Sequence, residues 1–277
     1  MTTHRMVAPG PYTVDQIREG DPYELSNGHL IECLPTGRRG GRSNAGGVQA
    51  LDTDPAVTSA GVDVGFSANP GHLRAPDISI GNVDNEPGWA HTAPPLAVEY
   101  ADTGQDEADL QSKITELLAA GTKFIWVVRL VGPRRVEVYT PGKPKRLVYS
   151  GDELTAPGIL QNSVPVDALF DREAAHEVTL RNLLQRKGFA SLEDVHERGK
   201  REGLDEGKLE GKLDVLRQIL TARGLDLTAE QRRRINDCKE IVQVEMWIQR
   251  SLGATQTSEI FVVPPAEKPA RRKRSRA

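Results

Sequence analysis

The sequence has few of the features that mark secreted, membrane-spanning or disulfide-rich proteins. Its only two cysteines, Cys33 and Cys238, lie far apart, so neither a disulfide framework nor a paired-thiol metal site is expected. No apolar run reaches the roughly eighteen residues that a bilayer span needs, and no apolar stretch near Met1 resembles a signal peptide. We therefore expect a protein of the reducing cytoplasm, without a membrane partner.

The charge of the chain is close to balanced, which excludes neither globular folding nor solubility. The formal net charge is -3 over 277 residues, long enough for one well-buried domain with appendages. Basic residues crowd the C-terminal end, at Lys268, Arg271, Arg272, Lys273, Arg274 and Arg276. Nucleic acid is one partner for such an end, and a solvated end without a role is the equal alternative.

Residues 20–171 alternate apolar and polar positions in the manner of strands, with one clear helix among them. Asn27-Gly28 predicts a tight hairpin turn, and a helix is expected from Asp109 to Gly121. Within the Gly/Arg-rich stretch 35–57 a weak helix could start near Ser43, but Gly46 and Gly47 disfavour it by about 1 kcal/mol each relative to alanine. The fold class expected is α/β of the α+β type, a mixed sheet flanked by helices. Further strands are expected at 62–66, 75–80, 94–100, 124–130 and 135–140.

Helical spacing of Leu and Val replaces strand alternation beyond residue 171, so we expect a C-terminal α-helical extension. The expected divisions are a flexible arm 1–19, the mixed domain 20–171, the extension 172–257 and a disordered basic tail 258–277. Within the extension, a charged helix at about 192–220 carries glycine at every fourth residue from Gly199 to Gly211, and a helical pair follows at about 228–252. Two interpretations explain these glycines equally well: close packing of this helix against another helix, or a flexible, solvated connector.

Two acidic residues and a lysine stand out in the mixed domain. Asp77 precedes one expected strand, Glu99 ends the next, and Lys113 lies on the following helix. Two carboxylates at strand ends can share Mg²⁺, which binds hard oxygen ligands and keeps water and phosphate oxygens in its remaining positions. Such a metal lowers the pKa of bound water, and a nearby lysine stabilises charge in the transition state. This combination is typical of a nuclease.

Each of these residues also has an ordinary structural explanation. Asp77 follows Pro76, which is common at turns, and Lys113 lies near Glu116 on what could be a solvated helix face. Glu99 differs, because it follows an apolar run and an unpaired buried carboxylate is costly.

The residues also resemble a known family. Pro76-Asp77, Glu99, Asp109-Leu110 with Lys113, Ala120-Gly121 and Trp126-Val127-Val128 are similar to the bacterial Uma-two family of the PD-(D/E)XK nuclease superfamily. The resemblance covers roughly residues 20–170. The superfamily's lysine usually lies two residues after the acid, where this chain has Ala101, so the resemblance implies that Lys113 supplies the lysine from the helix. Leu117 replaces a usual tyrosine, and no histidine opens the early helix.

The resemblance implies a restriction-endonuclease-like fold and a Mg²⁺-dependent endodeoxyribonuclease, with Mn²⁺ as a substitute metal. Asp77 and Glu99 would bind the metal, Lys113 would act in catalysis, and the product would carry a 5′-phosphate. Arg38, Arg39 and Arg42 are candidates for phosphate contacts, with a solvated loop as the alternative. A homodimer through the C-terminal helices would allow both DNA strands to be cut. The alternative function is a catalytically inactive nuclease-fold protein that binds DNA or serves in assembly.

Overall fold

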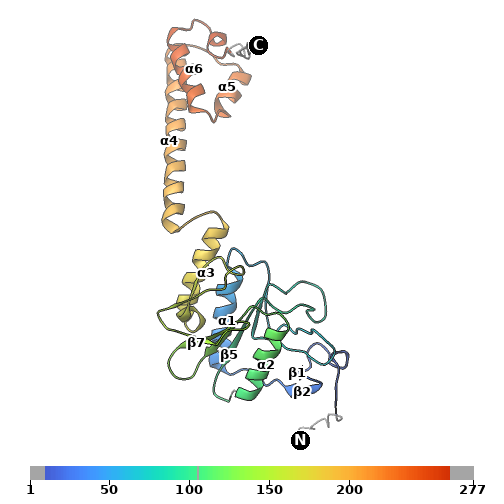
Figure 1. Ribbon diagram of the computed structural model, residues 1–277. Helices are drawn as coiled ribbons and strands as arrows, with labels where there is room; N and C mark the ends of the chain where they lie inside the picture. The colour runs from blue at the N-terminus through green and yellow to red at the C-terminus, as the bar shows by residue number, and fades with distance from the viewer. Residues whose placement is uncertain (1–9, 105, 263–277) are drawn as a thin grey trace, which may run out of the picture. The chain divides into compact units, whose positions relative to one another are not determined.

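The computed structural model describes residues 10–104 and 106–262 (Figure 1). The chain forms two compact units, residues 1–192 and 193–277, which are described separately below. No helix within the described residues has the length and apolar character needed to cross a membrane. The N-terminal unit contains the mixed sheet that the alternating sequence predicts.

The centre of the N-terminal unit is a six-stranded sheet with strand order β3-β4-β5-β6-β7-β8. Only the β5–β6 pair is parallel, and the other neighbouring pairs are antiparallel. Two small antiparallel pairs, β1–β2 and β9–β10, complete the strands. The strand bounds are β1 Tyr23–Ser26, β2 His29–Glu32, β3 Ala60–Val62, β4 Ile78–Ile80, β5 Leu96–Ala101, β6 Phe124–Arg129, β7 Arg135–Tyr139, β8 Arg146–Tyr149, β9 Glu153–Leu154 and β10 Val164–Pro165.

Helices cover both faces of this sheet (Figure 1). Helices α1 (Arg38–Asp52) and α3 (Arg172–Arg186) pack on the face formed by residues such as Val98, Trp126 and Val136. Helix α2 (Glu107–Ala119) packs on the opposite face, against Ala97 and Val127. Short 3₁₀ turns lie at Val14–Gln16 (η1), Val166–Leu169 (η2) and, in the other unit, Thr257–Glu259 (η3). The mixed sheet flanked by helices agrees with the fold class expected from the sequence.

Helix α1 occupies the glycine-rich stretch that was expected to be poor in helix, and it begins well before Ser43. Two of its glycines, Gly46 and Gly47, allow close packing with other elements. A Cβ on Gly47 would overlap the hydroxyl of Tyr100 and would lie 3.2 Å from Cδ1 of Ile78. A Cβ on Gly46 would lie 3.4 Å from Cβ of Ala175 on α3. Tertiary contact therefore overrides the low helix propensity of this segment.

Three expected boundaries differ in the structure. The strand expected at 62–66 ends at Val62, because Asp63 has a left-handed backbone (φ 52°) that interrupts strand pairing. Residues 10–19 of the expected flexible arm are held in place: Val14 N donates to Pro70 O at 2.8 Å, and Ile17 is buried. Helix α3, assigned above to the extension, belongs to the N-terminal unit, where it packs on α1.

The C-terminal unit consists of helix α4 (Leu192–Ala222), which ends beside the shorter helices α5 (Ala229–Asn236) and α6 (Ile241–Gly253). Leu216, Ile235 and Trp247 form its core. Ile260 and Phe261 complete this core, so residues 258–262 belong to a packed segment instead of the disordered tail. The rest of the expected tail, with its basic cluster, lies outside the described residues.

Candidate active site

Glu99 lies on β5, and Asp77 directly precedes β4, the antiparallel neighbour of β5. The register pairs Ile78 with Val98, so Asp77, one residue before Ile78, falls opposite Glu99, one residue after Val98. The amide of Tyr100 donates to Oδ2 of Asp77 at 2.6 Å. Strand pairing therefore brings the two carboxylates predicted from the sequence to one place.

Lys113 reaches the same place from helix α2. Asp106 caps this helix by accepting from the amides of Ala108 and Asp109, and Leu110, Ile114 and Leu117 bury its inner face. Lys113 extends from the same side of the helix. Its Nζ lies 2.9 Å from Oε1 of Glu99 and donates to the carbonyl of Ala75 at 2.8 Å. Only 12% of its side chain is exposed, so Lys113 does not lie on a solvated helix face.

Glu24 is a further site residue that sequence reasoning missed. It lies on β1 of the N-terminal hairpin, and its Oε1 is 2.9 Å from Nζ of Lys113. Oε2 of Glu24 accepts from Nη1 of Arg74 at 3.0 Å, and Nε of Arg74 donates to Glu116 at 2.6 Å. A buried chain of alternating charges thus runs from Lys113 through Glu24 and Arg74 to Glu116. Nothing in the sequence of this hairpin distinguishes Glu24 from a solvent-exposed acid, and its burial is seen only in the structure.

Asp63 is the second residue that the sequence did not single out. Its left-handed backbone places it at the end of β3, and its carboxylate interacts electrostatically with Asp77, Glu24 and Lys113. Asp is one of the few residue types besides glycine that adopt this backbone readily. The sequence analysis assigned it to a continuous strand, which would have hidden this role.

Burial sets the direction of the pKa shift for the acids Glu99, Asp77 and Asp63. It raises the pKa of Glu99 to about 8 and raises the pKa of Asp77, in both cases against the opposing effect of Lys113. Burial also raises the pKa of Asp63. For Lys113, burial lowers the pKa but Glu24, Glu99 and Asp77 outweigh it, so its pKa is raised. The ammonium form of Lys113 is therefore the stable one in this site.

The site has more carboxylates than cations, which fits a bound divalent metal. Glu24, Asp63, Asp77 and Glu99 surround Lys113, and Arg74 already contacts Glu24 and Glu116. Within residues 10–104 and 106–262, no three His, Cys, Asp or Glu side chains form a ready-made metal cage. Mg²⁺ does not require such a cage, because one or two carboxylates with water and substrate phosphate suffice. Asp77 and Glu99 are two carboxylates that would fit such a donor set.

The arginines at the start of α1 differ in their contacts. Arg39 forms an ion pair with Asp102, which directly follows β5. Arg38 and Arg42 are exposed, and among the described residues neither forms an ion pair. Asn44, on the same helix, donates to the carbonyl of Asp77 at 3.3 Å. The helix that carries these arginines therefore contacts the main chain of the site. The segment is a helix and not the expected loop, and the exposed side chains of Arg38 and Arg42 are open to solvent.

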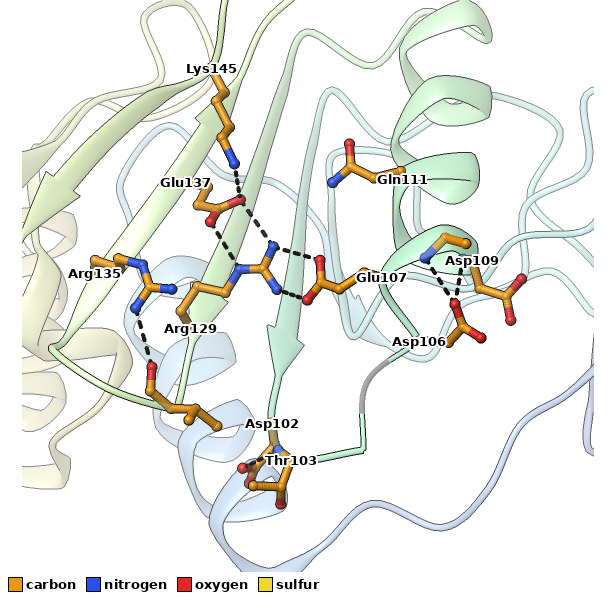
Figure 2. Close-up of polar contacts among 12 residues, drawn as sticks. Asp102, Thr103, Asp106, Glu107, Asp109, Gln111, Arg129, Arg135, Glu137 and Lys145 are labelled. Atoms are coloured by element: carbon orange, nitrogen blue, oxygen red, sulfur yellow. Dashed lines mark hydrogen bonds and ion pairs between the residues drawn. The ribbon is translucent and has the colours of Figure 1, made fainter.

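A second charged cluster lies on the α2 face of the sheet (Figure 2). Arg129, at the end of β6, donates through Nε to Oε1 of Glu137 at 3.1 Å and through Nη2 to Oε2 of Glu107 at 3.0 Å. Lys145 and the hydroxyl of Tyr139 also donate to Glu137, at 3.2 and 2.8 Å. Glu107 opens α2, so this cluster fixes the N-terminal end of the helix that carries Lys113.

Comparison with known proteins places this arrangement in a family. No curated protein matches the chain. Among solved structures, one titled as a putative nuclease belonging to DUF820 from Anabaena variabilis ATCC 29413 has a TM-score of 0.50 and 19% sequence identity, over 60% of this chain and 99% of that one. This likeness shows a shared fold. The family profile Uma2, described as "Putative restriction endonuclease", matches residues 12–167, a range that contains every site residue described above. The chain therefore belongs to the Uma2 (Uma-two) family.

Proposed function

We propose that the protein is a Mg²⁺-dependent endonuclease that hydrolyses phosphodiester bonds of DNA, with Mn²⁺ as a substitute metal. The observation that carries the proposal is the contact between Lys113 and Glu99 beside Asp77, with Nζ 2.9 Å from Oε1. A lysine placed against two neighbouring acids is the group of residues that this chemistry needs. Membership of a family described as restriction endonucleases supports the choice of DNA as substrate.

Asp77 and Glu99 would hold the metal. When bound, Mg²⁺ lowers the pKa of a coordinated water and screens the charge of the phosphate. The amide of Tyr100 fixes the orientation of the Asp77 carboxylate by its hydrogen bond. The burial that raises the pKa of both acids also strengthens their attraction for a cation.

Lys113 would stabilise negative charge at the phosphate. Its raised pKa keeps the ammonium protonated, and three oxygens hold it: the carbonyl of Ala75 and the carboxylates of Glu24 and Glu99. A cation held in advance needs no reorganisation as charge develops in the transition state. Arg38 and Arg42 are the proposed contacts to neighbouring phosphates of the DNA backbone.

The test is cleavage of supercoiled plasmid and of short single- and double-stranded DNA in Mg²⁺, in Mn²⁺ and in chelator. We expect cutting that requires the metal and that is lost in Asp77→Asn. Asp84→Asn, an exposed acid in the loop after β4, is the matched control and should cut normally. DNA binding without cleavage in any metal would instead favour the non-catalytic DNA-binding protein named above.

A further inference from the structure

A small hollow lies beside the site, between the loop that precedes β4 and the C-terminal half of α2. Its volume is about 230 Å³. Apolar side chains form most of its wall, with Phe66 and Leu117 buried and Ala68 and Ala119 exposed at its edge. The polar part of the wall includes Arg74 and Glu116, the same residues that continue the charge chain from Lys113.

Arg74 has one nitrogen, Nη2, that no group among the described residues pairs with. The residue is only 3% exposed, and Nε and Nη1 donate to Glu116 and Glu24. Nη2 is buried and has no hydrogen-bond partner among the described residues. A buried donor without a partner costs about 1–3 kcal/mol, so a ligand that supplies an acceptor here would recover this free energy.

The charges around Arg74 select the kind of acceptor. Two carboxylates already balance its guanidinium, and Glu99 and Asp77 lie further along the same chain of contacts. The carboxylates of Glu24 and Glu116 leave Arg74 no excess positive charge for an anionic ligand, whereas a neutral carbonyl oxygen or ring nitrogen needs only a hydrogen-bond donor. The apolar wall with Phe66 suits a flat, weakly polar body. The volume lies below the roughly 300–1,000 Å³ of pockets for drug-sized ligands, so the occupant is a single small group.

We propose that this hollow binds one unpaired nucleobase, with a neutral acceptor of the base receiving a hydrogen bond from Nη2 of Arg74. The inference rests on the proposed function, because the strand being cut is the source of the base. Bases that leave the stack are bound in this way, by an aromatic side chain and hydrogen bonds to their edges. Glu24 contacts both Arg74 and Lys113, so the base and the reacting phosphate would be held by one connected set of side chains.

The test measures binding without metal and without cleavage. Each of the four deoxynucleosides is titrated into the full chain by isothermal calorimetry, with deoxyribose as the control ligand. We expect at least one nucleoside to bind and deoxyribose not to bind. Ala68→Leu and Ala119→Leu fill the edge of the hollow without touching the charge chain, and each should weaken nucleoside binding at least tenfold. Ala108→Leu, at an exposed alanine in the first turn of α2, should leave it unchanged.

Two results would overturn the inference: no nucleoside binding up to the solubility limit, or binding that neither filling variant weakens. Both results are independent of the nuclease proposal. If the chain cuts DNA but binds no nucleoside, only the proposal of a base-binding hollow is contradicted. Conversely, if the chain binds nucleosides through the hollow but does not cut DNA, the base-binding hollow is supported and the nuclease proposal is contradicted.

Discussion

Glu24 contacts the ammonium of Lys113 at 2.9 Å, as Glu99 does, so its removal tests whether the placement of this lysine matters. We predict that Glu24→Gln lowers kcat for cleavage about 10- to 100-fold, because a charge-assisted hydrogen bond contributes about 1.5–3 kcal/mol and each 1.36 kcal/mol corresponds to tenfold in rate. KM should change little, since Glu24 would not contact DNA. Steady-state kinetics checks both values.

The control for this prediction is Glu32→Gln, at an exposed acid on the other strand of the same hairpin. Unchanged kcat in Glu24→Gln, or an equal loss in both variants, would show that Glu24 serves only the stability of the hairpin.

At the scale of residues, the sequence singled out Asp77 and Glu99, whose neighbours in the chain mark them. It did not single out the acids that join them only through tertiary structure. Glu99 could be recognised because it interrupts a buried apolar run. The assignment of Lys113 to the site depended on the family resemblance, because a lysine one position before an apolar residue on a helix usually faces solvent. Glu24 and Asp63 could not be recognised, because one lies on a separate hairpin and the other depends on a left-handed backbone that periodicity does not reveal.

Helix α1 depends on glycine at the position where it meets Tyr100. We predict that Gly47→Ala destabilises the protein by about 1–3 kcal/mol, because the added methyl group overlaps the Tyr100 hydroxyl and overpacking typically costs this much. Tyr100 also orients Asp77 through its amide, so cleavage should fall as well. Urea unfolding monitored by circular dichroism measures the stability change.

Gly41→Ala on the same helix is the matched control. A Cβ at this position meets nothing within 4 Å, so alanine should stabilise the helix by about 0.5–1 kcal/mol. A stability loss of the same size in both variants would contradict the proposed close packing at Gly47.

The cluster that fixes the start of α2 predicts how stability depends on pH (Figure 2). Burial raises the pKa of Glu137, but Arg129, Tyr139 and Lys145 outweigh it and lower the pKa from 4.5 to about 2. A lowered pKa in the folded state means that the carboxylate contributes stability above about pH 4.5, and this contribution is lost as the pH falls toward about 2. The melting temperature should therefore fall across this window.

Glu137→Gln separates this effect from general acid denaturation. The variant should be less stable than the native chain at neutral pH, by about 1–3 kcal/mol, and the difference should shrink as the pH falls. A difference between the two chains that stays constant from neutral pH to about pH 2 would contradict the assigned role of Glu137.

At the scale of elements, periodicity predicted the central strands and helix α2 well, because each buries one face in a regular pattern. It failed at α1, where Gly40, Gly41, Gly46 and Gly47 lower the intrinsic helix propensity. Residues distant in sequence pack where Gly46 and Gly47 leave room: Ile78, Tyr100 and Ala175. Propensity alone could not reveal that contact.

Helix α4 bears on the assembly of the whole molecule. Among residues 10–104 and 106–262, a Cβ at Gly199, Gly203, Gly207 or Gly211 would meet nothing within 4 Å, so no contact in this part of the chain offsets their cost of about 1 kcal/mol each. The homodimer expected from the sequence would offset it, and we predict a mass of two chains by light scattering. Gly207→Leu should reduce the mass to one chain, while Asp205→Leu on another face of the helix should not. A monomeric native chain would contradict the homodimer.

The whole-molecule division into two units could be predicted from the change in sequence pattern, but its position could not. Helix α3 has the same helical spacing as the segments that follow it, which placed it in the extension. Its contact with Gly46 of α1 assigns it to the unit that contains the site. Helical periodicity reports that a face is buried and does not report which surface buries it.

The central claim is that Lys113, supplied by a helix, acts on the phosphate in a metal-dependent nuclease. The most direct test compares single-turnover cleavage of saturating DNA in Mg²⁺ by the native chain, by Lys113→Gln and by Lys123→Gln, the exposed lysine that follows α2. Loss of a preorganised group that stabilises the transition state typically costs 10²–10³ in rate. We predict a loss of about this size in Lys113→Gln, with DNA affinity and fold retained, and native rates in Lys123→Gln. Native cleavage rates in Lys113→Gln would contradict the assignment of this lysine to the active site.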